Sequence, residues 1–178
     1  MKLHVVGITG LGLMFMLAPV VGAQTKISGA HKCAKAEVVG TTEVADKAGH
    51  TMTLVKDACE WTNPIEMEGL KAKEGTSTIF VDTTATRSSS TGVYVGTMEN
   101  GDKFFVSFHD SGPAKDGKAG AAKGTWTYTG GTGKLKGLTG KGTYTTSVND
   151  DGTGGAEVEG EYSIEKAAPK KAMEKKAN

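Results

Sequence analysis

Acid–base chemistry in this chain would depend on side chains within or directly beside predicted strands: Asp82, Glu99, His109 and Asp110. A general acid or base needs a carboxylate or histidine that faces inward and has a shifted pKa. None of them stands in a recognised constellation, because the chain has neither a G-x-S-x-G nucleophile motif nor an H-E-x-x-H zinc motif. We therefore predict no catalytic residue, and enzymatic activity stays open as an alternative.

The chain has two cysteines, Cys33 and Cys59. In an exported protein an even pair is most simply a disulfide, which would stabilise the fold by about 3 kcal/mol by restricting the unfolded chain. Metal or haem ligation is the alternative, since His31 stands close before Cys33. No C-x-x-C-H or paired C-x-x-C motif accompanies these residues. The sequence thus predicts a Cys33–Cys59 disulfide, no metal and no cofactor.

Aromatic side chains alternate with other residues in several segments, so many rings should point to one face of a sheet. In a closed barrel that face is the lumen, and aromatic walls with hydroxyl tips suit a small, mostly apolar ligand. The alternative is that the same rings only pack the core. The predicted ligand-binding residues are Trp126, Tyr128, Tyr144, Tyr162, Tyr94, Phe104 and Phe108.

The strands that would position these rings are clearest in residues 123–146. Residues 124–129 and 142–146 alternate aromatic residues with threonine, which is the period-two pattern of strands that bury one face. Between them, glycines allow positive φ angles, and Leu135 and Leu138 are the apolar residues that remain. This connection is predicted to be a compact, ordered corner.

Strand patterns with short turns recur along the rest of the chain, and no long helical period is present. Gly40 predicts a bulge or a close contact, and Asn100-Gly101 predicts a type I′ hairpin. Residues 24–32 are expected to form a polar arm and residues 111–122 a surface loop. Residues 65–71 suit either a short edge strand or a single helical turn. The predicted strands are residues 37–44, 51–55, 65–71, 76–86, 92–98, 103–109, 124–129, 142–147 and 156–165.

Sequential strands joined by short turns predict an all-β fold. The expected architecture is an antiparallel, mostly up-and-down barrel of about eight strands and calycin-like size. Such a barrel is filled by its own side chains or holds one small ligand. A two-sheet β-sandwich is the structural alternative.

The glycine-rich corner also resembles a known signature. Gly130-Gly131-Thr132-Gly133, followed by Gly140-Lys141-Gly142, is similar to the conserved glycine segment of the allene oxide cyclase and dirigent barrel superfamily. The resemblance implies a barrel in a small exported bacterial protein, with isomerase or cyclase chemistry in the lumen as an alternative to ligand binding. Because the signature is mostly glycine and structural, it assigns no catalytic residue to this chain.

Residues 1–23 have the pattern of a secretory signal peptide. Lys2 precedes the apolar residues 5–21, and Val21-Gly22-Ala23 offers the small residues that a signal peptidase recognises. We expect cleavage after Ala23, which would place the mature protein in the periplasm or outside the cell. Residues 24–165 would then form one barrel domain. No later apolar stretch is long enough to span a membrane.

Residues 166–178 are rich in lysine and alanine with little to bury, so we expect a disordered tail. The barrel residues carry more Asp and Glu than Lys and Arg, which argues against a nucleic-acid partner. An acidic barrel face together with a basic tail supports, as a further alternative, a structural or interaction protein of the cell envelope. The oligomeric state is left open.

Overall fold

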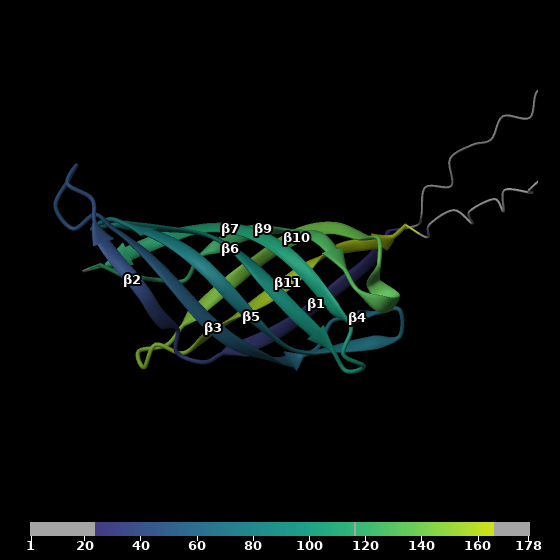
Figure 1. Ribbon diagram of the computed structural model, residues 1–178. Coiled ribbons are helices and arrows are strands. Elements are labelled where there is room, and N and C mark those ends of the chain that lie inside the picture. Colours follow the sequence, from purple (N-terminus) through teal and green to yellow (C-terminus); the bar gives the residue numbers. More distant parts are fainter. Residues whose placement is uncertain (1–23, 116, 166–178) are drawn as a thin grey trace, which may run out of the picture.

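The computed structural model describes residues 24–115 and 117–165 and is built almost entirely from β-strands. The predicted signal peptide and C-terminal tail lie outside these residues. One antiparallel sheet closes on itself to form a barrel (Figure 1). Its eight strands are β1 (Thr25–Cys33), β3 (Thr51–Asn63), β5 (Leu70–Thr83), β6 (Arg87–Met98), β7 (Lys103–Lys115), β9 (Lys123–Gly131), β10 (Leu138–Val148) and β11 (Gly154–Ile164).

The barrel is an up-and-down meander, because successive barrel strands are neighbours in the sheet. From β3 the order runs β5, β6, β7, β9, β10 and β11, and β11 then pairs with β1. Pairing of β1 with β3, and of β3 with β5, completes the ring. The predicted all-β, antiparallel, up-and-down barrel is therefore confirmed, and a single closed sheet rules out the two-sheet sandwich.

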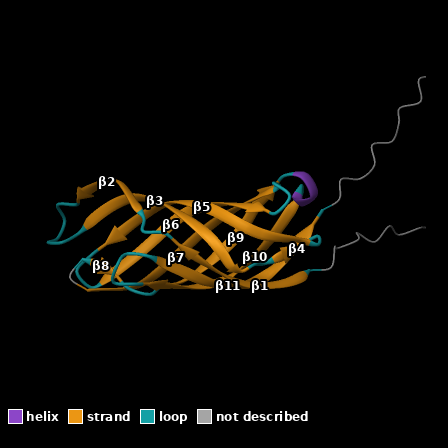
Figure 2. Ribbon diagram, turned by 90° about the horizontal axis from the view of Figure 1, so that it is seen from below, coloured by secondary structure: helices purple, strands orange, loops and turns teal. Residues whose placement is uncertain are grey.

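Three short strands lie outside the ring: β2 (Glu37–Glu43), β4 (Glu66–Met67) and β8 (Lys118–Ala119). β2 follows β1 and pairs with the first half of β3, so β1 and β2 together run along β3. β2 is exposed along its whole length and lies at the end of the barrel opposite to β4 (Figure 2). The predicted bulge at Gly40 is present as a register shift between Val38 and Gly40.

The segment predicted to be a polar arm is instead β1, a barrel strand that is paired on both sides. Its alternate positions Ile27, Gly29 and His31 face the interior, and only Ile27 is aliphatic, so no apolar alternation marks the strand. Gly29 suits this position because a Cβ there would lie 2.9 Å from the Trp61 ring. The inward face of β1 is thus filled by side chains from its neighbours.

The predicted loop at residues 111–122 is also shorter than expected. β7 continues to Lys115, with Arg87 of β6 opposite Pro113, and β8 pairs with the end of β7. This part of β7 could not be recognised from the sequence, because residues 111–115 contain no β-branched side chain and no apolar alternation.

The glycine-rich corner is compact and ordered, as predicted. It contains the 3-10 helix η1 (Gly133–Leu135), and the Leu135 and Leu138 side chains are almost completely buried. The Asp102 carboxylate in the β6–β7 turn accepts a hydrogen bond from the Lys134 backbone N–H at 3.0 Å, which ties the two connections together. No helix in the described part of the chain has the length and apolar character needed to cross a membrane.

The two ends of the barrel bury different kinds of side chain. The end that carries β4 and η1, which we call the closed end, is filled by Ile65, Met67, Leu70, Met98, Leu135 and Leu138. Toward the opposite end, which we call the open end, the buried side chains facing inward include Ser77, Thr83, Ser88 and Asp110. Because binding sites combine an apolar pocket with a few polar groups, these buried polar side chains make the open end the candidate binding region.

Candidate ligand-binding site in the barrel lumen

The barrel lumen contains a cavity of about 330 Å³, which lies between the closed end and the turns of the open end. Inward residues of all eight barrel strands line it, because alternate side chains of each strand point to the lumen. A volume of this size falls in the range of small-molecule pockets, roughly 300–1,000 Å³. The lumen is therefore only partly filled by its own side chains.

Aromatic rings that line the cavity contact one another in two groups. The Tyr94 and Phe104 ring centroids are 5.8 Å apart, Phe104 and Tyr128 are 5.8 Å apart, and Tyr128 and Trp126 are 4.8 Å apart. The Phe108 and Tyr144 rings meet edge to face at 6.0 Å. Such tilted and edge-to-face contacts are the favoured geometries of aromatic pairs.

The predicted ligand-binding residues fall into two groups. Those that line the cavity are Trp126, Tyr128, Tyr144, Tyr94, Phe104 and Phe108. Tyr162 is buried outside the cavity lining, where its hydroxyl accepts a hydrogen bond from the Glu68 backbone N–H at 3.3 Å. Tyr162 thus supports the β4 turn at the closed end.

Buried tyrosines of the cavity lining remain neutral phenols. Burial raises the pKa of Tyr94, although a hydrogen bond from Trp61 Nε1–H to the Tyr94 hydroxyl, 3.0 Å long, opposes the rise. Burial is also the main reason that the pKa of Tyr128 is raised. These hydroxyls therefore act at neutral pH as hydrogen-bonding groups on an otherwise apolar surface.

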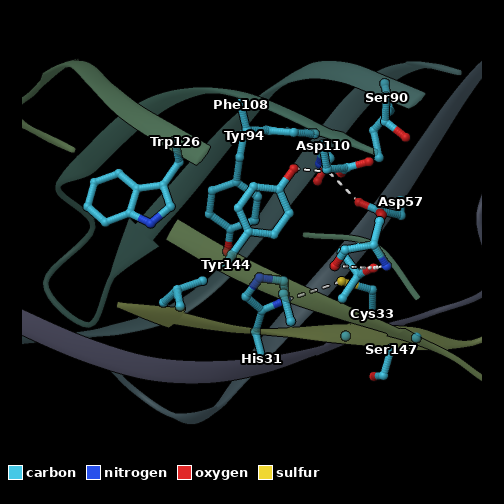
Figure 3. A pocket seen from close by; sticks show the side chains of 18 of the residues that line it. His31, Cys33, Asp57, Ser90, Tyr94, Phe108, Asp110, Trp126, Tyr144 and Ser147 are labelled. Carbon is cyan, nitrogen blue, oxygen red and sulfur yellow. Dashed lines mark hydrogen bonds between the residues drawn. The ribbon is translucent and has the colours of Figure 1, made fainter. Parts of the chain in front are cut away.

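Asp110 is a carboxylate inside the barrel, only 7% exposed, at the next inward position after Phe108 on β7. The Tyr144 hydroxyl donates a hydrogen bond to Asp110 Oδ2 at 2.6 Å (Figure 3). Burial and this hydrogen bond to Asp110 both raise the pKa of Tyr144, so the phenol keeps its proton. The pair presents a fixed carboxylate to the cavity.

The other acid–base candidates lie elsewhere. Asp82 accepts a hydrogen bond from His50 in the β2–β3 turn, Glu99 contacts the Lys71 backbone N–H at 3.4 Å, and His109 hydrogen-bonds with the Thr91 hydroxyl. None of Asp82, Glu99 and His109 is among the residues that line the cavity. Asp110 alone of the candidate set is positioned to act in the lumen.

Asp57 and His31 also line the cavity. Asp57 was not singled out from the sequence, and His31 was considered only as an alternative metal or haem ligand. Asp57 accepts a hydrogen bond from the Ser77 backbone N–H at 3.2 Å. Burial lowers the pKa of His31, opposed by the nearby Asp57 charge, so the imidazole is neutral at pH 7. The alternation that places Cys59 and Trp61 on one face of β3 also contains Asp57, and this signal could have identified it.

The predicted disulfide between Cys33 and Cys59 is confirmed. It joins directly opposite residues of β1 and β3, and Cys33 is part of the cavity lining. The His31 Nδ1–H group lies 3.3 Å from Cys33 Sγ, and candidate ligand atoms of His31, Cys33 and Cys59 lie within 4.8 Å of one another. Because both sulfurs are bonded to each other, neither is available as the thiolate that binds metals.

The cavity lining contains acidic side chains but no lysine or arginine. Asp57 and Asp110 are the acidic side chains among the lining residues. The four ion pairs found among the described residues involve neither aspartate. The lumen therefore combines aromatic walls with a negative charge that no basic side chain of the lining balances.

Fold and site together define an eight-stranded antiparallel β-barrel with a partly polar lumenal cavity. Among solved structures, the chain is similar to a protein of unknown function from the DUF3224 family of Shewanella oneidensis MR-1. The two share 15% identity over 82% of this chain and 100% of that chain, with a TM-score of 0.44. It is also similar to a pterocarpan synthase dirigent protein, at 14% identity over 84% of this chain and 98% of that chain, with a TM-score of 0.43. No protein-family model and no curated protein sequence matches the chain.

Proposed function

We propose that this protein is exported and binds a small, mostly apolar molecule in the barrel lumen. The observation that carries the proposal is the cavity of about 330 Å³ with aromatic walls. The buried side chains at the closed end pack against one another and fill the barrel there. The side chains around the cavity, in contrast, do not fill the lumen between them. An unfilled apolar cavity with a few convergent polar groups is the usual form of a binding site.

Two features support the export part of the proposal. Residues 1–23 carry the leader pattern, and the Cys33–Cys59 disulfide suits an oxidising compartment such as the periplasm or the exterior. In this proposal residues 24–165 are the binding domain, and the Lys/Ala-rich residues 166–178 follow it as a tail. N-terminal sequencing of protein recovered from its own host would test the cleavage after Ala23.

Binding can be measured through the tryptophans, because Trp61 and Trp126 both line the cavity. Apolar fluorescent probes should quench their emission in a saturable way. We expect Ser90→Leu, which adds an apolar side chain to the cavity lining, to weaken this binding by about tenfold or more.

Ser89→Leu is the matched control, because it makes the same change at the neighbouring residue of β6, which is not part of the cavity lining. Equal affinities of the two variants would place the probe outside the lumen. A flat titration of the unmodified protein with every probe, together with no extra mass in native mass spectrometry of protein from its own compartment, would contradict the proposed function.

A further inference from the structure

We infer that the molecule bound in the lumen is an organic cation, with an apolar or aromatic body and a protonated amine that contacts Asp110 and Asp57. This inference rests on the proposed function, because it names the chemical class of the ligand for the same cavity. It goes further by assigning the polar half of the cavity to recognition of a positive charge.

The first step is the unbalanced charge of the lumen. Asp57 and Asp110 line the same cavity, and its lining contains no lysine or arginine to pair with them. Withdrawing a carboxylate such as that of Asp110 from water is costly, and the one hydrogen bond from Tyr144 offsets only part of that cost. A ligand that brings one positive charge would offset this cost, whereas an anionic ligand would increase it.

The second step is the state of Asp110. Asp110 is 7% exposed as a whole residue, and its Oδ2 accepts a hydrogen bond from the Tyr144 hydroxyl at 2.6 Å. Oδ1 has no hydrogen-bond partner among the described residues, although Asp110 is a lining residue of the cavity. One oxygen is therefore fixed by the protein, and the other is left for a donor that comes from the cavity.

The third step is the surroundings of the two aspartates. Figure 3 shows Asp57, Asp110 and the Tyr144 hydroxyl on the side of the pocket away from Trp126. An ammonium group has three N–H donors, which matches free oxygens of two carboxylates and the lone pairs of the Tyr144 hydroxyl. The rings of Tyr94 and Phe108 line the same cavity and offer aromatic faces, which also attract organic cations.

The aromatic surroundings favour an organic cation over a metal ion. Calcium takes six to eight oxygen ligands, and magnesium demands an octahedral set of oxygens. The lining of this cavity also offers hydroxyl groups, such as those of Ser77, Ser88 and Ser90, but the aromatic rings that make up much of the wall cannot ligate a hard cation. An amine joined to an apolar body uses both kinds of surface at once.

The test is calorimetric titration of the full chain with two probes of the same shape. 2-Naphthylmethylamine carries a positive charge at pH 7, and 2-naphthylmethanol is its neutral counterpart. We expect the amine to bind about tenfold or more tightly than the alcohol, because hydrogen bonds to a charged group are stronger than neutral ones. Equal affinities would overturn the cation inference and leave the proposed function intact.

Substitutions assign the charge to its residues. Asp110→Asn keeps an acceptor for Tyr144 but removes the charge, and we expect it to weaken binding of the amine by about tenfold with little effect on the alcohol. Asp57→Asn should act in the same direction. Glu157→Gln is the control, because it removes the same charge from an exposed position on β11.

Each remaining outcome is decisive. Loss of amine binding in Glu157→Gln as well would overturn the assignment to the lumen. Tight binding of calcium chloride or magnesium chloride alone, abolished in Asp110→Asn, would overturn the organic ligand in favour of a metal ion. If Asp110→Asn does not fold, Asp57→Asn and the probe comparison on the unmodified protein still decide the inference. If neither probe binds and no apolar probe quenches tryptophan emission, the proposed function fails with it.

Discussion

At the scale of single residues, the lumen is shaped by close contacts between rings and backbone. The Phe104 ring lies directly over Gly96 of the neighbouring strand β6. A Cβ built on Gly96 would lie 2.0 Å from Phe104 Cζ, which is closer than side-chain contacts allow. The glycine is therefore required for the ring to lie against the wall and leave the cavity open beyond it.

We expect Gly96→Ala to destabilise the barrel by about 1–3 kcal/mol, because the Phe104 ring must move within a packed core. Gly40→Ala is the matched control, since a Cβ at Gly40 would have no heavy atom within 4 Å. Urea unfolding of both variants gives the comparison. Equal stability of the two variants would show that the Phe104 ring has room to adjust.

The residue scale also separates Asp110 from the other acid–base candidates. Counting inward positions along β7 from Phe104 and Phe108 leads directly to Asp110, so its place in the lumen could be predicted from the period of two. Its partner could not be predicted, because Tyr144 is 34 residues away in the chain. Only closure of the barrel brings this hydroxyl to the carboxylate.

At the scale of elements, His50 connects the β2–β3 turn to barrel strand β5 through hydrogen bonds. His50 Nδ1 lies 2.6 Å from Asp46 Oδ1, and His50 Nε2 lies 3.0 Å from Asp82 Oδ1 on β5. The hydrogen bond with Asp46 is the main reason that the pKa of His50 is raised, and the same bond lowers the pKa of Asp46. Both shifts mean that the fold favours the protonated form of His50, whose two ring nitrogens lie next to the carboxylates of Asp46 and Asp82.

This histidine predicts a pH-dependent stability. Because the pKa of His50 is higher in the folded protein, its contribution is fully present below the unfolded value of about 6.5 and is lost as the pH rises through the folded pKa. Because the pKa of Asp46 is lowered on folding, the contribution also falls when the pH drops through that folded pKa. The advantage of the unmodified protein over His50→Gln should thus be largest in mildly acidic solution.

The measurement is the free energy of unfolding of both proteins between pH 4 and pH 9, by denaturant titration. His109→Gln is the control, since His109 hydrogen-bonds to a threonine and contacts no carboxylate in the described structure. A difference between the unmodified protein and His50→Gln that stays constant from pH 6 to pH 9 would contradict the charged form of His50.

Elements with a strong pattern could be predicted, and those without one could not. The hairpin of β6 and β7 and the glycine-rich corner were predicted, because aromatic or β-branched residues alternate there and the turns contain glycine. The predicted type I′ turn was wrong, because Gly101 has positive φ but Asn100 does not, and the loop between Met98 and Asp102 has three residues. β1 was missed, since its inward positions include Gly29 and His31. Its strand conformation is imposed by hydrogen bonds to β3 and β11 on either side.

At the scale of the whole molecule, the disulfide joins the two strands at which the barrel closes. Cys33 and Cys59 are opposite residues of β1 and β3, and β1 is the strand that pairs with β11 at the other end of the sheet. The bond fixes a contact between segments separated by 26 residues. It therefore restricts the unfolded chain where the ring must be completed.

We expect the double variant Cys33→Ser/Cys59→Ser to lose about 3 kcal/mol of unfolding free energy. Denaturant unfolding under non-reducing conditions measures the loss, and adding a thiol reductant to the unmodified protein should reproduce it. The reductant should have no effect on the double variant. Equal stability of the oxidised protein and the double variant would show that the hydrogen-bonded ring alone holds the strands in place.

The sequence by itself determined the fold class, most of the strands, the disulfide and most of the aromatic rings that line the lumen. These features depend on local alternation, turn residues and cysteine number, which can be recognised within short segments. Only the tertiary structure decided which end of the barrel is closed, that β1 is part of the ring, and that Asp57 and Asp110 share one cavity with Tyr144. Those facts depend on strand order and on the stagger of the closed sheet, which set the neighbours of each inward side chain and are not encoded in any one segment.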